Sequence, residues 1–471
     1  MLQIMNVKKV KIVATIGPAS DSLEVLTQLA EAGVNVFRIN LSHAEREQTL
    51  SIVKSIRSIE KKLKKPLAIM GDLAGPKIRI GKVENGVVLK NGDLLDIVSK
   101  PVVSDGSKVS VNYPTMIGQM KKGAEIFVDD GRIRLTVEKE GKEKATARVI
   151  VGGPLVSFKG FYAQGITLNI KIPSKKDIDD IQLMVEAGAD ALAVSFVQSE
   201  KDIQAVRDVL PENAKHMMLI AKIETVKAID NIEKITTHSD GIMVARGDLG
   251  LAVPMAEVPH LQKRLINLCL SKSKPVITAT QMLESMTTNP LPTRAEVTDV
   301  ANAILDGTDA VMLSGETAMG KFPVETVKMM AEIIRNAVPN VIRREFDHEN
   351  AVGNAVSASV GRVADQVDAR VVVAFTHQGK AAHRISRHRY PQIIYALSPV
   401  PETIRKLNFS FGVFPFLITP TKDFMEMREQ AKKIVRDNPI MKLDTGEAFV
   451  IAAGMPFGQT GTSNMILVER A

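Results

Sequence analysis

Residues 220–250, with the sequence IAKIETVKAIDNIEKITTHSDGIMVARGDLG, contain two short apolar strands that end in charge and an amphipathic helix between them. Lys222 and Glu224 are two residues apart on the first strand, so the pleat directs both side chains to one face. Arg246 and Asp248 end the second strand. Two cations and two carboxylates at the carboxyl ends of neighbouring parallel strands can hold a divalent metal against a phosphoryl group. An ion-pair network that caps a barrel gives the same pattern, and this stretch alone leaves both interpretations open.

The same phrase of helix end, glycine, Asn or Asp, and buried strand recurs along the chain, as in EAGVNVFRIN, EAGADALAVSF and LDGTDAVMLSG. Near-continuous apolar strands that alternate with helices indicate a parallel sheet covered on both faces. Eight such units predict a TIM (β/α)8 barrel. The predicted strands are residues 11–17, 36–42, 67–73, 191–197, 218–224, 241–247, 275–281 and 310–316.

Two further domains accompany the barrel. After the third strand the pattern changes to Gly- and Val-rich segments with period two, such as RIRLTVEK and KATARVIV, separated by hairpin signals such as ENG and DDGR. The segment SKKDIDDIQLMVEAG then supplies the missing third helix, and beyond residue 340 short strands again alternate with helices. We predict barrel segments at 1–74 and 171–340, an inserted all-β lid domain (a β-barrel) at 75–170, and a C-terminal α/β effector domain at 341–471.

Composition limits the classes of partner. The chain of 471 residues has 61 Lys and Arg against 53 Asp and Glu, a net charge of +8 that suits an anionic ligand. Its basic residues are scattered, only 4% of residues are aromatic and none is Trp, which argues against nucleic acid. The one cysteine, Cys269, is expected to be a packed thiol in a reducing compartment. No apolar run approaches the ~18 residues of a membrane span, so we expect a soluble cytoplasmic protein with no membrane partner.

Polar residues end nearly every predicted barrel strand, which is where TIM barrels place their active sites. This frequency favours an active site over a structural network. Glu224 and Asp248 are the candidate ligands for Mg²⁺ or Mn²⁺, because hard cations prefer carboxylate oxygens. Arg38 and Lys222 can neutralise a phosphoryl group in transfer. The strand-end residues are Arg38, Asn40, Ser42, His43, Asp72, Ser195, Lys222, Glu224, Arg246, Gly247, Asp248, Thr280, Gln281, Ser314 and Glu316.

Several long motifs are similar to those of one family. VFRINLSHA, GDLAGPKIR, LIAKIETVKAIDNI, VARGDLG, ITATQMLESM, the segment from PTRAEVTDV to GKFPVE and the closing GTSN together resemble the pyruvate kinases over essentially the whole length. The resemblance implies phosphoryl transfer from phosphoenolpyruvate to ADP, giving pyruvate and ATP in the final step of glycolysis. It also implies a barrel, an inserted lid and a C-terminal effector domain, usually in a homotetramer.

The resemblance assigns roles by position. Glu224 and Asp248 would hold the metal, Lys222 would stabilise the transferring phosphoryl group, and Arg38 would contact phosphate. Gly247, Asp248 and Thr280 would receive the substrate carboxylate, and Thr280 with Ser314 and Glu316 would line the path of a proton to the enolate. Residues expected near the nucleotide phosphates are Asn40, His43, Arg79 and Lys176.

Lys77 departs from many members of the family, which require potassium and have a glutamate at this position of GDLAGPKIR. We expect its ammonium to replace the cation near Asn40, Ser42, Asp72 and Leu73, so that potassium is not required.

The C-terminal domain has the loop THQGK where many relatives bind a sugar bisphosphate through a serine-rich loop. Thr376, Gln378, Gly379 and Lys380 can form a nest for a phosphorylated effector, faced by Thr462 and Ser463. Two alternative functions stay open: a metal-dependent lyase or aldolase acting on enol or keto acids, and a non-catalytic sugar-phosphate sensor.

Overall fold

Eight buried strands close a parallel barrel in the order β1-β16-β15-β14-β13-β12-β3-β2, as predicted. The strands are apolar throughout because one face fills the lumen while the other packs against the surrounding helices. The computed structural model describes residues 7–42, 44–166, 170–346, 351–438, 440–456 and 463–471. The strands are β1 (Lys11–Ile16), β2 (Val36–Asn40), β3 (Ala68–Asp72), β12 (Ala191–Val194), β13 (Met218–Ile223), β14 (Gly241–Ala245), β15 (Val276–Ala279) and β16 (Ala310–Leu313).

The recurring glycine and Asn or Asp of the sequence each have a structural role. Helices α1 (Leu23–Ala32), α3 (Lys175–Ala187) and α9 (Arg294–Asp306) end at Gly33, Gly188 and Gly307, whose positive φ would strain a residue with a side chain. Two residues later, the carboxylate of Asp190 accepts a hydrogen bond from Ile69 N of the neighbouring strand at 2.8 Å. Three other side-chain oxygens accept from backbone amides of neighbouring strands in the same way: Asn35 from Ile12 N, Asp240 from Leu219 N and Asp309 from Val276 N. The repeat therefore fixes the starting register of alternate barrel strands.

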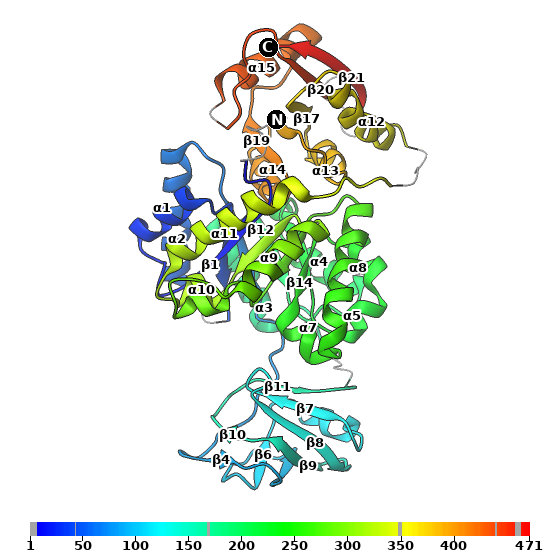
Figure 1. Cartoon of the computed structure of the whole chain (residues 1–471). Coiled ribbons are helices and arrows are strands. Elements are labelled where there is room, and N and C mark those ends of the chain that lie inside the picture. Colours follow the sequence, from blue (N-terminus) through cyan, green and yellow to red (C-terminus); the bar gives the residue numbers. More distant parts are fainter. Residues whose placement is uncertain (1–6, 43, 167–169, 347–350, 439, 457–462) are drawn as a thin grey trace.

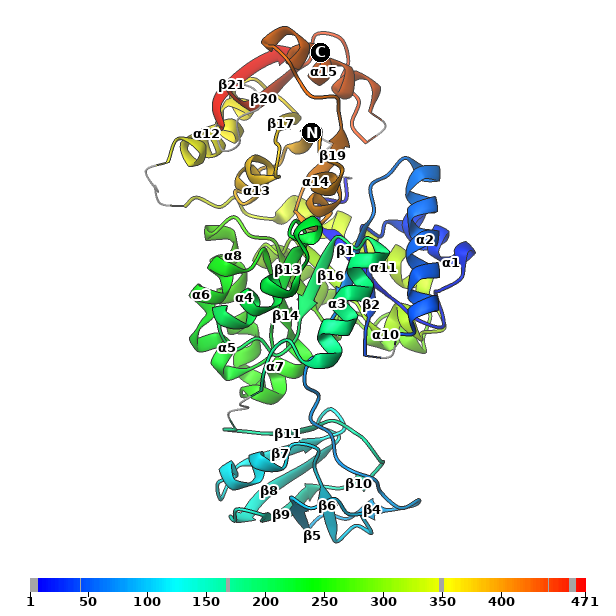
Figure 2. The ribbon, with the colours of Figure 1, turned by 180° about the vertical axis from the view of Figure 1, so that it is seen from behind.

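Helices cover the outside of the barrel (Figures 1 and 2). Ser174 and Thr293 begin α3 and α9 with full capping boxes, in which a side-chain oxygen satisfies free amides of the first turn. The helices are α1 (Leu23–Ala32), α2 (Arg46–Leu63), α3 (Lys175–Ala187), α4 (Glu200–Val209), α5 (Val226–Asp230), α6 (Ile232–His238), α7 (Arg246–Ala252), α8 (Val258–Ser271), α9 (Arg294–Asp306), α10 (Gly315–Ala318) and α11 (Pro323–Ala337).

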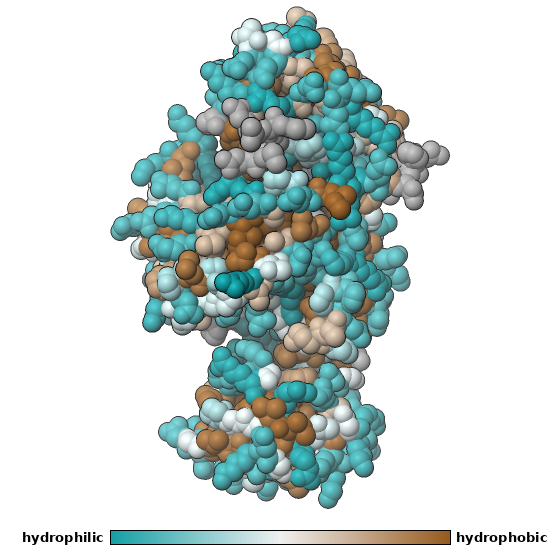
Figure 3. All heavy atoms as spheres, viewed as in Figure 1, coloured by the Kyte–Doolittle hydropathy of each residue, from teal (hydrophilic) through white to brown (hydrophobic). Residues whose placement is uncertain are grey.

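The chain between β3 and α3 forms a separate all-β body with its own core, joined to the barrel through a narrow waist (Figure 3). Its main sheet has the order β11-β7-β8-β9-β5-β6 and does not close as a continuous barrel. Isolated bridges from Arg79 to Gly160 and from Ile80 to Val111 link its two edges, so it approaches the predicted β-barrel. Its boundaries with the barrel stay predictions. The strands are β4 (Val88–Leu89), β5 (Leu94–Val98), β6 (Lys108–Ser110), β7 (Glu125–Val128), β8 (Ile133–Lys139), β9 (Lys144–Val151), β10 (Gly153–Pro154) and β11 (Phe161–Ala163).

The C-terminal domain is a three-layer α/β structure with the sheet order β19-β18-β17-β20-β21, in which only β21 is antiparallel to its neighbour. Alternate residues of β17 face opposite layers: Val372 and Ala374 pack with α12 and α13, whereas Val371 and Val373 pack with α15. Its elements are α12 (Val352–Gln366), β17 (Val371–Phe375), α13 (Lys380–Ser386), β18 (Ile393–Ser398), α14 (Pro401–Lys406), β19 (Val413–Leu417), α15 (Phe424–Asp437), β20 (Ala448–Gly454) and β21 (Ser463–Arg470).

This domain rests on the amino ends of the barrel strands, opposite the inserted domain (Figures 1 and 2). Phe409, which follows α14, is fully buried with the side chains of the barrel lumen. Buried Lys9 donates to the carbonyls of Pro391 and Gln392, and buried Lys11 donates to Val413 O. The interface therefore combines the buried aromatic side chain of Phe409 with two buried lysines, Lys11 on β1 and Lys9 just before it.

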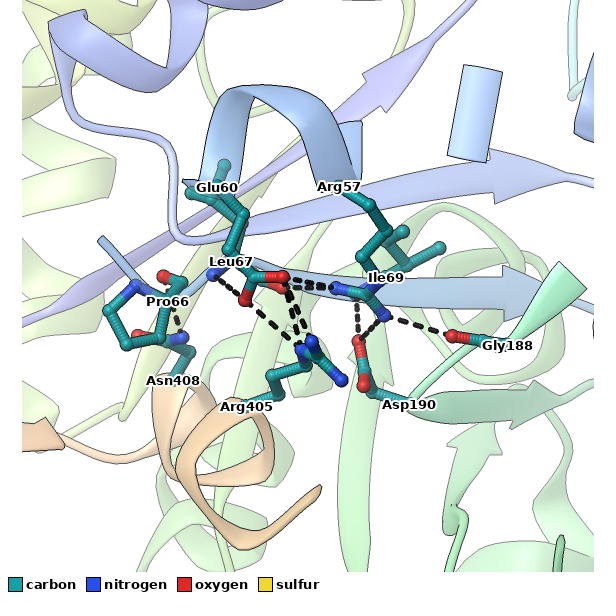
Figure 4. Close-up of polar contacts among 9 residues, drawn as sticks. All are labelled: Arg57, Glu60, Pro66, Leu67, Ile69, Gly188, Asp190, Arg405 and Asn408. Carbon is teal, nitrogen blue, oxygen red and sulfur yellow. Dashed lines mark hydrogen bonds and ion pairs between the residues drawn. The ribbon is translucent and has the colours of Figure 1, made fainter. Parts of the chain in front are cut away.

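An ion-pair network, drawn in Figure 4, extends from α14 into the barrel. Arg405 Nε lies 3.0 Å from Glu60 Oε1 on α2, and Glu60 also accepts from Leu67 N at 3.1 Å. Next to Glu60, Arg57 donates to Asp190, which holds the start of β3 through Ile69 N. Strand β3 ends at Asp72, so the network fixes the far end of a strand that reaches the candidate active site.

No helix within the described ranges is long and apolar enough to cross a membrane.

Candidate active site

A cavity of about 660 Å³ lies between the carboxyl ends of the barrel strands and the inserted domain. Side chains from β2, β3, β13 and the start of α7 meet residues of the inserted domain around it, because the carboxyl ends of parallel strands share one rim. The residues from the sequence prediction that line this cavity are Arg38, Asn40, Ser42, Asp72, Leu73, Lys77, Arg79, Ser195, Lys222, Glu224 and Asp248.

Lys222 lies at the centre of this set. Its Nζ is 2.8 Å from Glu224 Oε1, 3.2 Å from Asp72 Oδ1 and 2.7 Å from Ser195 Oγ. Burial opposes the charged form, but Asp72 and Glu224 outweigh it and raise the pKa of Lys222 above its usual value. Lys222 is therefore a permanent cation whose position is fixed by three oxygen partners.

Arg38 supplies the second cation. Its guanidinium bonds Asp72 Oδ2 through Nε at 2.7 Å and through Nη2 at 2.6 Å, and Nη1 donates to Thr15 Oγ1 at 2.8 Å. Burial raises the pKa of Asp72, but Lys222 and Arg38 overcome that effect and hold it below its usual range. Asp72 thus stays ionised and orients both cations, since Nε and Nη2 of Arg38 share its Oδ2 while Lys222 faces its Oδ1.

Glu224 and Asp248 form the candidate metal centre. Glu224 is buried and accepts from Phe196 N at 2.8 Å as well as from Lys222. Asp248 opens onto the cavity, but its pKa is raised to about 7, first by desolvation in the cleft and then by repulsion from Glu224, while Lys222 opposes the shift. A divalent cation removes such repulsion, so the pair fits Mg²⁺ or Mn²⁺. No trio of His, Cys, Asp or Glu in the described ranges makes a ready metal cluster, so an ion held by this pair would need further oxygen ligands from substrate or water.

Gly247 and Thr280 contact each other next to Asp248, but neither lines the cavity. Gly247 N donates to Thr280 Oγ1 at 2.8 Å, and their shared role toward a substrate carboxylate stays a prediction. Thr280 and Gln281 have positive φ, 70° and 51°, which is uncommon for residues with side chains. Arg246 holds this bend through Thr280 O at 2.7 Å and is itself paired with Asp299 at 2.7 Å.

Ser314 and Glu316 follow β16 and do not line the cavity. Glu316 is fully buried, and its two carboxylate oxygens accept from Leu283 N at 3.1 Å and Ser314 N at 2.7 Å. These contacts position the loops that follow β15 and β16. The proton path assigned to Thr280, Ser314 and Glu316 stays a prediction.

Lys77 reaches the predicted cation position. Its Nζ donates to Ser42 Oγ at 2.7 Å, and Ser42 N donates to Asn40 Oδ1 at 3.2 Å. Desolvation and the neighbouring Arg79 and Lys222 lower the pKa of Lys77, while Asp72 and Asp248 raise it. These contacts place Lys77 beside Ser42, and its replacement of a potassium ion stays a prediction.

The remaining predicted residues are less central. Arg79 lines the cavity, whereas Lys176 does not: its Nζ bonds Asp180 and Leu41 O at 2.7–2.8 Å. His43 and Thr462 lie outside the described residues. In the C-terminal loop, Thr376 Oγ1 accepts from Gly379 N at 2.9 Å, so that hydroxyl closes the turn. Gln378 and Lys380 are exposed and line a different cavity, between this domain and the barrel.

Three contributors were missed in the sequence. Thr15, the partner of Arg38, is the next-to-last residue of β1 and could have been found by the same strand-end rule that found the others. The backbone amide of Phe196 and the side chain of Asp130 had no signal of their own, because one is main chain and the other lies on the inserted domain.

Comparison with known proteins agrees with this geometry. Residues 7–327 match the pyruvate kinase barrel domain, and residues 354–469 match the pyruvate kinase alpha/beta domain. The chain belongs to the pyruvate kinase family. It is 40% identical over 469 residues to pyruvate kinase 2 of Synechocystis sp., covering 98% of this chain and 79% of the relative. It is 38% identical over 468 residues to the pyruvate kinase of Methylorubrum extorquens, and the match covers 98% of this chain and 97% of that relative. It is 40% identical over 473 residues to the pyruvate kinase of Geobacillus stearothermophilus, and the match covers 98% of this chain and 80% of that relative.

Family membership makes the chain a kinase that transfers a phosphoryl group from phosphoenolpyruvate to ADP. The lyase, aldolase and sensor alternatives have no support from these matches. The TIM barrel and the C-terminal α/β domain predicted from the sequence are confirmed.

Proposed function

We propose that Lys222 and Arg38 stabilise the negative charge of the phosphoryl group while it is transferred in this reaction. The observation that supports this most strongly is the position of Lys222 Nζ, within 3.2 Å of Asp72, Glu224 and Ser195 at the base of the cavity. The bond from the enol oxygen to phosphorus breaks, and a bond from a terminal oxygen of ADP to phosphorus forms. Two fixed cations favour this step because negative charge spreads over the phosphoryl oxygens as it proceeds.

The enolate left behind takes a proton on carbon to become pyruvate. We assign the substrate carboxylate to the Gly247 and Asp248 amides and Thr280, and the proton path to Thr280, Ser314 and Glu316. The first assignment is supported by the place of Gly247 and Thr280 beside Asp248, which lines the cavity; a substrate carboxylate would replace the contact between Gly247 N and Thr280 Oγ1. Asn40, His43, Arg79 and Lys176 are assigned to the nucleotide phosphates.

Glu224 and Asp248 would hold Mg²⁺ or Mn²⁺, which supplies charge neutralisation and orientation for the phosphoryl oxygens. The test of the reaction is a coupled assay for pyruvate and ATP from phosphoenolpyruvate, ADP and Mg²⁺. We expect both pyruvate and ATP to form, and both to be lost when the metal is chelated. The absence of pyruvate at saturating substrate concentrations would contradict the assignment.

Lys77 makes this a potassium-independent enzyme in our proposal. The support is its bond to Ser42 Oγ beside Asn40 and Asp72. We expect full turnover in buffer without sodium or potassium. A tenfold or greater rise on addition of potassium would refute it.

For an effector site and an oligomeric state we propose what the resemblance to the pyruvate kinases implies. We assign a phosphorylated effector to the loop of Thr376, Gln378, Gly379 and Lys380, and we propose a homotetramer. Met255, Leu291 and Met319, apolar side chains 67–72% exposed on barrel loops, would gain from coverage in an oligomer. Light scattering coupled to size-exclusion chromatography tests the tetramer.

A further inference from the structure

A second cavity, of about 800 Å³, lies at the opposite end of the barrel from the active site. Its barrel wall consists of residues next to the amino ends of β13, β14 and β15, including Lys272 and Lys274. Its other wall consists of α13 and α14 of the C-terminal domain, with Lys380, Arg384 and Lys406. The cavity is thus built by two domains (Figures 1 and 2 show α13 and α14 over the barrel).

The lining is strongly cationic. Eight Lys and Arg side chains line it, against the two carboxylates of Asp240 and Glu402. Asp240 is already engaged, because it accepts from Arg207 at 2.7 Å and from Leu219 N at 2.9 Å. Within the described ranges Lys272, Lys380 and Lys406 have no carboxylate partner within ion-pair distance, so these three positive charges are left for a ligand.

The amines influence one another across the domain boundary. Desolvation lowers the pKa of Lys274, Asp240 opposes that shift, and Arg207 and Lys380 lower the pKa further. Burial, followed by the charge of Lys274, lowers the pKa of His383 to about 4. Cations from both walls therefore repel across a partly desolvated space, a field that a small dianion would relieve.

We propose that this interdomain cavity binds a small phosphate-bearing ligand, held by Lys272 and Lys274 from the barrel and by Arg384 and Lys406 from the C-terminal domain. The volume admits a phosphate ester larger than a phosphate ion. A lysine is suited to such a ligand because its ammonium provides charge and three donors. The site is distinct from an effector nest made by the loop of residues 376–380 alone, because it requires barrel side chains.

The site also has a direct structural connection to the catalytic strands. Lys406 is adjacent to Arg405 on α14, and Arg405 bonds Glu60 of α2 at 3.0 Å. Through Arg57 and Asp190, the same network holds the start of β3. A ligand that draws α14 toward the barrel would thus act on the strand that ends in Asp72.

Binding is tested by calorimetric titration of the full chain with inorganic phosphate and, separately, with glucose 1-phosphate. We expect the ester to bind more tightly than the free ion, and we expect Lys272→Gln and Lys406→Gln each to weaken its binding about tenfold. Lys201→Gln is the matched control, since it removes one exposed lysine of α4 that does not line the cavity. Its affinity should equal that of the wild type.

Three results would overturn the proposal. One is the absence of binding by either probe at millimolar concentration. A second is unchanged affinity in Lys272→Gln, which would place the phosphate in the active site or in the C-terminal loop. The third is equal weakening in Lys201→Gln, which would indicate net charge instead of a site. Since the readout is binding, none of these results bears on the phosphotransferase assignment.

Discussion

Lys222 and Lys227 both line the catalytic cavity, but they differ in their surroundings. Lys222 is held by Asp72, Glu224 and Ser195, whereas Lys227 is exposed. Since the pKa of Lys222 is raised, its charge is present throughout the working pH range and does not depend on substrate binding. A charge fixed in advance costs no reorganisation during the reaction.

Lys222→Met should therefore lower kcat/KM by roughly 10³-fold, equivalent to about 4 kcal/mol of transition-state stabilisation. Lys227→Met is the control, and we expect it to stay within about threefold of the wild type. Steady-state kinetics on both variants, with circular dichroism to check the fold, makes the measurement. Retained turnover in Lys222→Met would remove this residue from the mechanism.

Lys77→Glu should convert the enzyme to potassium dependence. The carboxylate replaces an ammonium that touches Ser42 near Asp72, so two anions would face each other without a cation. We expect activity in potassium-free buffer to fall at least tenfold and to recover on titration with potassium. The wild type, assayed in the same series, should not respond. A variant that stays inactive at high potassium would show that Lys77 has another role.

At the scale of elements, Arg246 joins the start of α7 to the end of β15. Its guanidinium donates to Thr280 O at 2.7 Å and pairs with Asp299, while the residue after it, Gly247, bonds the Thr280 hydroxyl. Its geometry keeps two non-glycine residues, Thr280 and Gln281, in a bend with positive φ. Arg246 is a positioning residue.

Arg246→Lys should keep the charge but lose the planar fork that reaches a carbonyl and a carboxylate together. We expect about a tenfold fall in kcat/KM for phosphoenolpyruvate with little change in the KM for ADP. Asp299→Asn, which weakens only the anchor of Arg246, should show a smaller effect of the same kind. Equal losses for both substrates would indicate general disruption of the barrel rim.

The strand ends could be predicted from the sequence because buried apolar runs followed by polar residues mark them clearly. Every barrel strand falls within its predicted range, and Arg38, Asp72, Lys222 and Glu224 meet at one cavity. The partners of Glu316 could not be predicted, since they are backbone amides of loops after two different strands. The sequence pattern predicts which side chain lies at the end of a strand, but the backbone amide that this side chain bonds depends on the geometry of the loops.

At the scale of the whole molecule, Lys9 and Lys11 connect the barrel to the C-terminal domain while buried. Burial lowers the pKa of each to about 7, with Lys65 adding to the shift of Lys11 and Asp309 opposing it. Between pH 7 and about 10.5 the unfolded chain therefore binds more protons than the folded one. Stability should rise with pH in that window, by up to about 1.4 kcal/mol per pH unit for each lysine.

Lys9→Met with Lys11→Met removes this dependence. We expect the melting temperature of the wild type to rise relative to that of the double variant between pH 7.5 and pH 9.0. Only the wild type has these two amines, which take up protons when the chain unfolds, and this uptake becomes less favourable as the pH rises. Differential scanning calorimetry at several pH values makes the comparison. A constant difference across the window would mean that both lysines remain charged in the folded protein.

The closure of the barrel also sets an order of events during synthesis. Strand β1 pairs with β16, so the first strand of the barrel to leave the ribosome bonds to the last, from Lys11 with Ala310 to Ala14 with Leu313. Lys9 and Lys11 find their carbonyl partners later still, at Pro391 and Val413. Contacts so distant in sequence form slowly. Strand β2 pairs with one edge of β1 soon after synthesis, but the other edge and the two lysines must stay without these partners until the later segments have been made.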